Sequence, residues 1–355
     1  MTEAEAMQRG VDLAWRGWGR VHPNPLVGAV VLQDGRVVGE GWHAEFGAAH
    51  AEVAALGAAG PAASGGTMVV TLEPCRHHGQ QPPCTEAILA AGIRRVVFGL
   101  ADPNPGAGGG AALLAQRGLE VVEARHPAVA EQNATFLHRF GGATRPFVAL
   151  KLATSVDGRV ADYTGRARWI SGPLAREWVH WLRAGFDAIG VGGRTARADD
   201  PALTVRGSVV PRVPPRRVVF DRRADLAGAG QLVGTARQVP VTVVCEAAAP
   251  DVRRELEESG IEVLAASGLE EGLVRLRESG IGSLLVEGGG RLAGRLMQAG
   301  LVDRFYWVQS PLWLGEDGLA AFAGLRGELL EQARRWRVVE RHGFEDDTVL
   351  VLSRQ

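Results

Sequence analysis

The sequence predicts an α/β protein with two domains. Strand and helix patterns alternate from Thr2 to Arg139, and they alternate again from Phe147 to Leu352. Between these regions, Gly141–Pro146 is rich in turn-forming residues and has no hydrophobic periodicity. A chain of 355 residues is also long enough for two domains. We therefore expect one domain at residues 1–144 and another at 145–355.

The N-terminal half begins with a capping box, Thr2 to Glu5, which opens a helix that runs to about Trp18. The turn Asp34-Gly35 predicts a hairpin. One helix is expected to begin at His50 and another at Cys84, where the thiolate would gain from the helix dipole. The other expected elements are strands at 26–32, 36–43, 67–72, 95–99 and 119–122, and helices at 110–117 and 127–139.

A metal site is predicted between His50 and Cys84. His50 and Cys84 begin helices, and Cys75 follows a strand. One imidazole and two thiolates suit tetrahedral zinc, and three protein ligands leave a position open for water, as in catalytic sites. Glu52 is not needed as a ligand and can move protons between that water and a substrate nitrogen. The order His-x-Glu, then Pro-Cys and a second Cys, is typical of zinc nucleobase deaminases.

The spacing of the two cysteines departs from the usual deaminase motif. Eight residues, Arg76 to Pro83, separate Cys75 from Cys84, where two are usual. Two unrelated buried thiols and a surface histidine would be the alternative interpretation. His77 and His78 lie between the cysteines and could be further ligands. A full ligand set would close the open position, so we expect them in a substrate-facing loop.

Asn24 and His43 are candidate substrate-binding residues of the same site. Pro23 and Pro25 hold Asn24 in an extended turn that presents its amide. Asn24 and His43 lie at the outer ends of the predicted hairpin, near the start of the His50 helix. Turn chemistry or a solvated surface would explain either residue equally well.

The C-terminal half begins with a strand, 147–152, that contains Lys151, the only lysine in the chain. A lysine can donate a proton, whereas an arginine barely can. A helix is expected after Pro173, containing Arg176, His180 and Arg183, and a polar loop is expected at 197–206. The other expected elements are strands at 188–191, 218–221, 239–245, 261–264, 283–287, 304–308 and 348–352, and helices at 251–259, 269–279 and up to Ala299.

Gly288–Gly294 follows a predicted strand and opens a predicted helix. Its glycines match a pattern in which backbone amides at a helix N-terminus bind phosphate. A glycine-rich tight turn explains the same residues as well. The motif also falls late in the chain, which argues against a Rossmann domain.

Composition excludes several classes of protein. With 39 basic and 40 acidic residues, the chain has no electrostatic footprint for nucleic acid. No apolar run is long enough to span a membrane, and the acidic N-terminus has no signal-peptide pattern. Three cysteines cannot all pair, and two are assigned to a metal, so we expect a cytoplasmic protein. Cys245 lies in an apolar strand and is expected to be a buried spectator.

The motifs together resemble the bifunctional riboflavin biosynthesis deaminase–reductase family over nearly the whole length. The eight-residue gap between the cysteines is typical of that family. The motifs that carry the resemblance are Pro23–Gly28, Gly41–His43, His50–Val53, Thr71–Gly79, Pro82–Cys84, Asp102–Pro105, Lys151-Leu152, Ser155–Arg159, Trp169-Ile170, Asp199–Arg206 and Glu287–Gly289.

The resemblance implies a cytidine-deaminase-like three-layer α/β/α domain that removes an amino group from a phosphoribosylated diaminopyrimidinone. Zinc on His50, Cys75 and Cys84 and the proton carrier Glu52 would perform this step, with Asn24 and His43 holding the substrate. Relatives commonly carry a basic residue, suited to the substrate phosphate, where this chain has Gln80. Arg76 is the candidate substitute.

The resemblance also implies a dihydrofolate-reductase-like α/β domain that reduces the ribosyl group to ribityl with NADPH. Lys151 and Asp199 would move protons, and Arg183 and Arg206 suit the phosphate. Relatives often carry serine at Ala167, so a contact there would involve its backbone. The cofactor would contact Ala153, Trp169, Thr195, Asp199, Gly289, Gly290, Arg291, Leu292, Ala293, Gly294 and Arg295. The substrate would contact Ala167, Arg183, Leu203, Arg206 and Glu287. The resemblance favours a homo-oligomer, a dimer or tetramer formed through this half.

Two other interpretations compete with this one. A deaminase of another nucleobase could be joined to a C-terminal nucleotide-binding domain, although such enzymes favour the short cysteine spacing. A structural zinc module could be joined to a nucleotide-binding scaffold. The structural module predicts a fourth protein ligand and no role for Glu52.

Overall fold

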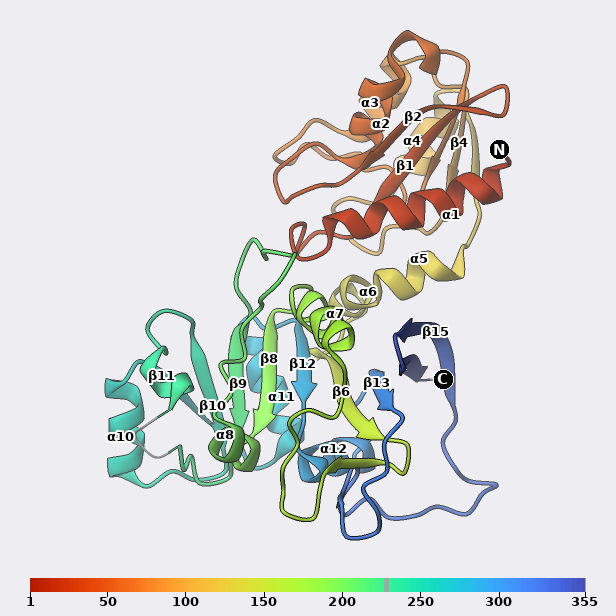
Figure 1. Ribbon diagram of the computed structural model, residues 1–355. Coiled ribbons are helices and arrows are strands. Elements are labelled where there is room, and N and C mark those ends of the chain that lie inside the picture. The colour runs from red at the N-terminus through yellow and green to blue at the C-terminus, as the bar shows by residue number, and fades with distance from the viewer. Residues whose placement is uncertain (227–229, 355) are drawn as a thin grey trace. The chain divides into compact units, whose positions relative to one another are not determined.

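A computed structural model describes residues 1–226 and 230–354. The chain divides into two compact units, Met1–Gly142 and Ala143–Gln355, close to the expected boundary after residue 144. The first unit has a five-stranded sheet in the order β2-β1-β3-β4-β5 (Figure 1). Its elements are α1 (Glu3–Ala14), the 3₁₀ helices Trp15–Gly17 and Gly60–Ala63, β1 (Gly28–Gln33), β2 (Arg36–Trp42), α2 (Ala51–Ala59), β3 (Thr67–Val70), α3 (Cys84–Ala90), β4 (Arg95–Phe98), α4 (Gly110–Gln116), β5 (Glu120–Glu123), α5 (Pro127–Gln132) and α6 (Ala134–Phe140).

Helices cover both faces of this sheet, as the three-layer prediction requires. Neighbouring strand residues point to opposite faces, so the sheet presents apolar side chains on both sides. Ala29, Val31 and Val70 pack with α2, α3 and α4. Val30 and Val69 pack with α1 and α5 on the other face. The first of these cores holds α2, which follows His50, and α3, which begins at Cys84, against the central strands.

One predicted helix, 127–139, is wrong in detail because it breaks at Asn133. The Asn133 side chain is buried. Its Oδ1 accepts the Leu26 N–H (2.8 Å), and its Nδ2 donates to the Leu26 carbonyl (3.0 Å). A buried amide needs such partners. The break between α5 and α6 therefore connects this segment to the chain just before β1.

The second unit contains a nine-stranded sheet in the order β11-β10-β9-β8-β12-β6-β13-β16-β15. The strands from β11 to β13 are parallel, and β16 and β15 add an antiparallel hairpin. Its elements are β6 (Phe147–Ser155), β7 (Arg159–Ala161), α7 (Pro173–Arg183), β8 (Ala188–Gly192), α8 (Gly193–Asp199), β9 (Arg216–Phe220), α9 (Gln231–Gly234), β10 (Val241–Cys245), α10 (Pro250–Glu258), β11 (Ile261–Ala265), α11 (Leu269–Glu278), β12 (Ser283–Glu287), α12 (Gly290–Gln298), β13 (Arg304–Ser310), β14 (Leu319–Ala320), β15 (Trp336–Phe344) and β16 (Asp347–Arg354).

Two apolar cores lie on opposite faces of the nine-stranded sheet. Val218 and Val244 pack with α11 and α12, whereas Val219 and Val243 pack with α8 and α10. The expected α/β class is therefore confirmed in both units. The predicted loop at 197–206 is wrong at its start, because α8 continues to Asp199 and the chain turns at Asp200 with a φ of 42°.

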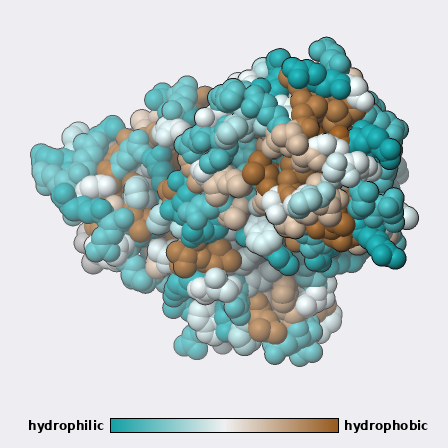
Figure 2. All heavy atoms as spheres, turned by 90° about the horizontal axis from the view of Figure 1, so that it is seen from above, coloured by the Kyte–Doolittle hydropathy of each residue, from teal (hydrophilic) through white to brown (hydrophobic). Residues whose placement is uncertain are grey.

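Within the described residues, no helix is long and apolar enough to cross a membrane. The face shown in Figure 2 carries hydrophilic residues over much of its area, with separate hydrophobic patches among them.

Candidate active sites

The three predicted metal ligands come together in the first unit. His50 caps α2, Cys84 is the first residue of α3, and Cys75 lies in the loop after β3. Their ligand atoms all lie within 4.8 Å of one another, and both sulfurs are buried. Among the described residues this group includes no fourth side chain, so one coordination position is left for water or substrate.

The spacing of the ligand atoms fits a zinc ion. His50 Nδ1 lies 3.2 Å from Cys84 Sγ and 3.5 Å from Cys75 Sγ. Tetrahedral zinc with ordinary bond lengths separates a nitrogen and a sulfur ligand by about 3.5 Å. The Cys84 N–H also points to Cys75 Sγ at 3.4 Å, which stabilises that sulfur as a thiolate. The donor set and its geometry therefore suit Zn²⁺.

Glu52 lies beside the ligands on the first turn of α2, and only 4% of its surface is exposed. Burial raises the pKa of Glu52 to about 7. A carboxyl group with a pKa near the operating pH can both accept and donate a proton. Its position and burial suit the predicted role of proton carrier.

Asn24 and His43 lie in the same cavity of about 290 Å³ as His50, Glu52 and Cys75. Asn24 Nδ2 lies 3.2 Å from His43 Nε2, and the His43 ring contacts the His50 ring with centroids 5.4 Å apart. His43 is buried, and burial lowers its pKa, which favours the neutral ring. Both residues are therefore placed to hold a substrate over the metal.

Glu73 has a structural role that the sequence interpretation missed. Its carboxylate accepts backbone N–H groups from Asp102 (3.1 Å), Gly109 (3.0 Å) and Ala111 (3.0 Å). Glu73 is buried and lies two positions before Cys75. It therefore binds the 102–111 segment to the strand end that carries a metal ligand. The Glu-Pro-Cys sequence was visible, but its three partners are remote along the chain.

The loop between the cysteines meets its predictions only in part. His77 lines the cavity, whereas His78 lies 3.4 Å from Glu86 with 72% of its side chain exposed. Arg76, the proposed substitute for a basic residue at Gln80, instead donates from Nε to the Gly108 carbonyl at 2.7 Å. Gln81 donates to the Gly47 carbonyl at 3.0 Å. This loop therefore uses its polar groups largely to hold neighbouring backbone.

The second unit brings Lys151, Arg183 and Glu287 together. Lys151 on β6 and Glu287 on β12 are direct neighbours in the parallel ladder. Arg183, at the end of α7, binds Glu287 through Nε (2.5 Å) and Nη2 (2.9 Å). Burial would raise the pKa of Glu287, but Arg183, with Lys151 and His180, lowers it to about 2. Burial lowers the pKa of Lys151, which favours proton donation.

This cluster changes two predicted roles. The carboxylate that acts on Lys151 is Glu287, where the sequence interpretation paired Lys151 with Asp199. Arg183 was expected to face a phosphate, yet two of its nitrogens bind Glu287 and the third donates to the Thr204 carbonyl at 2.9 Å. The sequence of α7 alone does not show that Arg183 has a partner 104 residues away, at Glu287.

His180 belongs to the same cluster, although no role was predicted for it. Its Nδ1 lies 3.2 Å from the Arg206 backbone nitrogen and 3.4 Å from Arg183 Nη1. Burial and the neighbouring charges of Arg183 and Arg206 lower the pKa of His180 to about 4. A neutral His180 thus accepts the Arg206 N–H and holds the start of the 206–215 loop against α7. His180 and Arg183 are three residues apart on a helix and therefore neighbours on its surface, and this spacing was the sequence signal that could have linked them.

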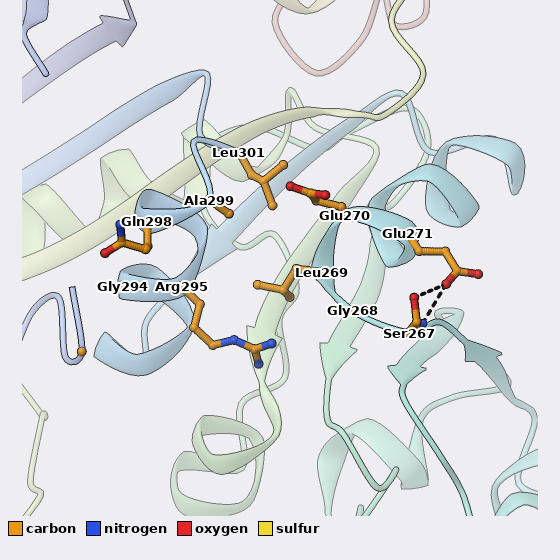
Figure 3. A pocket seen from close by; sticks show the side chains of 11 residues that line it. Ser267, Gly268, Leu269, Glu270, Glu271, Gly294, Arg295, Gln298, Ala299 and Leu301 are labelled. Atoms are coloured by element: carbon orange, nitrogen blue, oxygen red, sulfur yellow. Dashed lines mark hydrogen bonds between the residues drawn. The ribbon is translucent and has the colours of Figure 1, made fainter. Parts of the chain in front are cut away.

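A cavity of about 620 Å³ opens at the carboxyl ends of β8, β9 and β10. Parallel α/β sheets bind ligands at this edge. The cavity is lined by six arginines against three acidic residues, which suits a polyanion. The arginines are Arg194, Arg197, Arg222, Arg223, Arg291 and Arg295, and the acids are Asp221, Asp225 and Glu246. A neighbouring hollow shares Gly268, Leu269 and Arg295, with Arg295 of α12 near the start of α11 (Figure 3).

The glycine-rich motif serves the packing of α12 as well as this cavity. Gly288 and Gly289 have φ values of 67° and 75°, and a Cβ at Gly289 would lie 2.7 Å from Thr195 Oγ1. A Cβ at Gly290 would overlap the Ala320 carbonyl oxygen. Ala293 is completely buried. Of the predicted cradle Gly289–Arg295, the residues that line the cavity are Arg291, Leu292 and Arg295.

The remaining predicted contacts lie on β6, on α8 and in the loops around them. Ala153 continues β6 beyond Lys151, and Thr195 and Asp199 lie on α8. Arg168, the residue between Ala167 and Trp169 in the sequence, donates to the Asp199 carbonyl at 2.6 Å. Trp169 is 68% exposed. Leu203 is buried with a φ of 49°.

Comparison with known proteins identifies the family of each unit. Residues 146–350 match the family model of the RibD C-terminal domain, and residues 1–100 match the cytidine and deoxycytidylate deaminase zinc-binding region. The chain belongs to the RibD family. The riboflavin biosynthesis protein RibD of Escherichia coli (strain K12) is 40% identical, with 99% of each chain covered. RibD of Aquifex aeolicus (strain VF5) is 37% identical, covering 98% of this chain and 97% of the relative.

Solved RibD structures share the whole fold. Acinetobacter baumannii RibD, form 1, has a TM-score of 0.84 and 35% identity, with 99% of both chains covered. A diaminohydroxyphosphoribosylaminopyrimidine deaminase/5-amino-6-(5-phosphoribosylamino)uracil reductase from Thermotoga maritima has a TM-score of 0.84 and 34% identity over 99% of both chains.

Membership of the RibD family makes this chain a bifunctional deaminase and reductase of riboflavin biosynthesis. Its cofactors are Zn²⁺ and NADPH. The interpretation as a deaminase of another nucleobase is set aside, because residues 146–350 match the RibD reductase domain. The interpretation as a structural zinc module is set aside because Glu52 lies beside a three-ligand cluster.

Proposed function

We propose that the first unit deaminates a diaminopyrimidinone carrying ribose 5-phosphate, and that the second unit reduces the ribosyl group of the product to ribityl. The three-ligand cluster beside Glu52 is the observation that carries the first step. The name of the Thermotoga maritima relative supports this substrate. The proposal assigns one substrate to a chain in which each unit has its own cavity.

Deamination exchanges an amino group for an oxygen from water. His50, Cys75 and Cys84 would hold the zinc ion, which would supply an activated water at the open position. Glu52 would accept one proton from that water and pass it to a ring nitrogen as the oxygen bonds to the ring carbon. It would then accept the second proton of the same water and donate it to the departing amine, which leaves as ammonia. Asn24 and His43 orient the ring over the metal. Each proton that Glu52 accepts is donated again, so the residue is regenerated.

Reduction adds a hydride to C1 of the sugar and a proton to the sugar oxygen as the ring opens. Lys151 is the proposed proton donor, because its pKa is lowered and Glu287 lies next to it. Glu287 and Arg183 hold the charge balance around Lys151 and contact the substrate. Arg206 remains the proposed phosphate contact, since His180 fixes its backbone. Asp199 stays a proposed cofactor contact.

The arginine-rich cavity is the proposed site for NADPH. Asp221 is the first residue after β9, and its carboxylate accepts a hydrogen bond from Arg197 Nη1 at 2.6 Å. Arg222 and Arg223 follow it in the sequence. An acidic residue at such a strand end favours NADH by binding the ribose hydroxyls. Here Asp221 is already paired with Arg197, and two arginines follow Asp221 in the sequence. This arrangement favours the extra phosphate of NADPH. Changing Arg222 and Arg223 to Gln should lower the NADPH-to-NADH preference in kcat/KM about tenfold or more.

We also propose a cytoplasmic homo-oligomer, a dimer or tetramer, with no nucleic acid and no membrane partner. The described cysteines are all free thiols, as in a reducing compartment. Strand β15 forms one edge of the nine-stranded sheet, where a second copy can add to it. Light scattering coupled to gel filtration measures the mass, and a monomeric mass would contradict this proposal.

Mass spectrometry tests the two reactions together. Purified protein is incubated with the diaminopyrimidinone phosphate, first without and then with NADPH. Exchange of an amino group for oxygen should appear in both samples, and the addition of two hydrogens should appear only with NADPH. An unchanged substrate mass in both samples would refute the assignment.

A further inference from the structure

The cavity of the first unit has an uneven distribution of charge. Glu52, Glu73 and Asp102 are the acidic residues that line it, and Glu52 lies next to the metal ligands. Among the described residues lining this cavity, Arg139 is the only one with a permanent positive charge. Besides the metal ligand His50, the imidazoles that line the cavity are those of buried His43 and exposed His77. A phosphate in this cavity is therefore attracted to Arg139 and repelled by the acids.

A series of contacts shows where Arg139 lies relative to the metal ligands. The His50 ring touches the His43 ring, and His43 lies 3.2 Å from Asn24. Two residues before Asn24, His22 Nε2 lies 3.4 Å from Arg139 Nη2. Arg139 is thus connected to the metal site through Asn24 and its preceding turn. A substrate whose reacting ring lies over Asn24 and His43 extends its sugar phosphate away from the metal, toward α6.

The surroundings of Arg139 favour a strong contact with phosphate. It comes from α6, between Phe136 and Phe140, whose ring centroids are 5.0 Å apart and which also line the cavity. Apolar walls lower the local dielectric and strengthen an ion pair. A guanidinium has five N–H donors in one plane, so it can keep contacts within the protein, such as the one with His22, while it binds phosphate oxygens.

The loop between the cysteines contributes only uncharged glutamine side chains and His77 to this cavity. Gln81 donates to the Gly47 carbonyl at 3.0 Å, and Gln80 also lines the cavity. Arg76 is not among the lining residues, and it donates to the Gly108 carbonyl. Among the described lining residues, the permanent positive charge that can recognise a phosphate is therefore on α6.

We propose that Arg139 binds the substrate phosphate in the deaminase cavity and sets its preference for a phosphorylated substrate. The inference rests on the proposed function, because it assumes that a phosphoribosyl group enters this cavity. It assigns the recognition to a helix outside the zinc-binding motifs. Arg139 contacts a part of the substrate that does not react. It therefore affects how tightly the substrate binds and how much of that binding energy lowers the barrier of the reaction.

The test compares the 5′-phosphorylated diaminopyrimidinone with its dephosphorylated form as deamination substrates. In Arg139→Gln, kcat/KM for the phosphorylated form should fall roughly 10- to 100-fold, the range for losing a hydrogen-bonded charge pair. The value for the dephosphorylated form should stay within about twofold, which also shows that the site is folded. Arg139→Lys should recover part of the preference, since it restores the charge without the planar donors.

The matched control is Arg125→Gln, because the Arg125 side chain is 82% exposed and pairs with Glu123 outside the cavity. This control variant should leave kcat/KM unchanged for both substrates. An equal loss for both substrates in Arg139→Gln, or an unchanged preference, would overturn the inference. If the wild-type protein deaminates neither form, the proposed function itself fails. If Arg139→Gln does not fold, inhibition by ribose 5-phosphate decides: weaker inhibition of Arg139→Lys than of wild type supports the inference, and equal inhibition overturns it.

Discussion

The two units assemble their reacting groups from different distances along the chain. In the first, His50 and Cys84 are 34 residues apart, and both begin helices that pack on one face of the sheet. In the second, Arg183 and Glu287 are 104 residues apart and meet only after the nine-stranded sheet has formed. The first site depends on a metal held by a local motif. The second depends on buried charges that must balance one another.

Removal of zinc should produce the largest difference between the deaminase and reductase activities. Dialysis against a chelator takes away the group that activates water, so deamination should fall below detection. Reduction of the deaminated intermediate with NADPH should be unchanged, because no cluster of metal ligands lies in the described part of the second unit. Both rates are measured on the same sample, and added zinc should restore the first. A parallel loss of reduction would contradict the independence of the sites.

Glu52→Gln should remove deamination while keeping the metal. The amide is nearly the same size but cannot carry a proton, so the rate should fall by about 10² to 10⁴. Zinc content, measured by elemental analysis, should match that of the wild-type protein. Glu40→Gln is a suitable control, since Glu40 pairs with Arg9 outside the cavity. A variant that still deaminates at a normal rate would remove Glu52 from the mechanism.

Glu287→Gln should damage the second site through charge imbalance. It leaves Arg183 and Lys151 without their buried carboxylate, so unfolding should cost about 3 kcal/mol less. Reductase kcat/KM should fall at least tenfold, whereas deamination should be retained. Glu262→Gln removes the partner of Arg216 in a surface pair and should cost less than about 1 kcal/mol. Denaturant titration compares them, and equal losses would argue against the buried cluster.

His180 should give the smallest effect, a dependence of stability on pH. The pKa of His180 is about 4 in the folded chain, against an ordinary value of 6.5, so the unfolded chain binds more protons between these values. The free energy of unfolding should therefore rise with pH across this window, by up to about 1 kcal/mol after screening by solvent. His180→Gln should flatten this slope, and His78→Gln, on an exposed loop, should not. An unchanged slope in His180→Gln would assign the effect to other groups.

Local patterns in the sequence predicted the first site better than the second. His50, Glu52 and Cys84 lie at predicted helix starts, Cys75 follows a predicted strand, and the structure brings all four together. Glu73 was overlooked because its partners are backbone amides of a distant loop. Arg183 was assigned to phosphate because a sequence cannot show that Glu287 occupies its guanidinium.

Strands β7, β14 and β15 were not predicted from the sequence, for a similar reason. Strand β15 alternates partly buried residues with charged ones such as Arg337, Glu340 and Arg341, and it packs only at a sheet edge. Its apolar pattern is therefore weak. Strands β7 and β14 are too short to show any periodicity, and they pair only with each other. By contrast, the central strands are buried on both faces and were all predicted.

The packing of α12 limits how the cofactor preference of this enzyme can be altered by design. Any side chain added at Gly290 meets the Ala320 carbonyl behind the helix, and one added at Gly294 meets Ala323. Mutational libraries at these glycines would mostly sample misfolded chains. Arg291 and Arg295 are exposed on the same helix and line the cavity that we propose for NADPH, so substitutions there are the better route to test for a different nicotinamide dinucleotide.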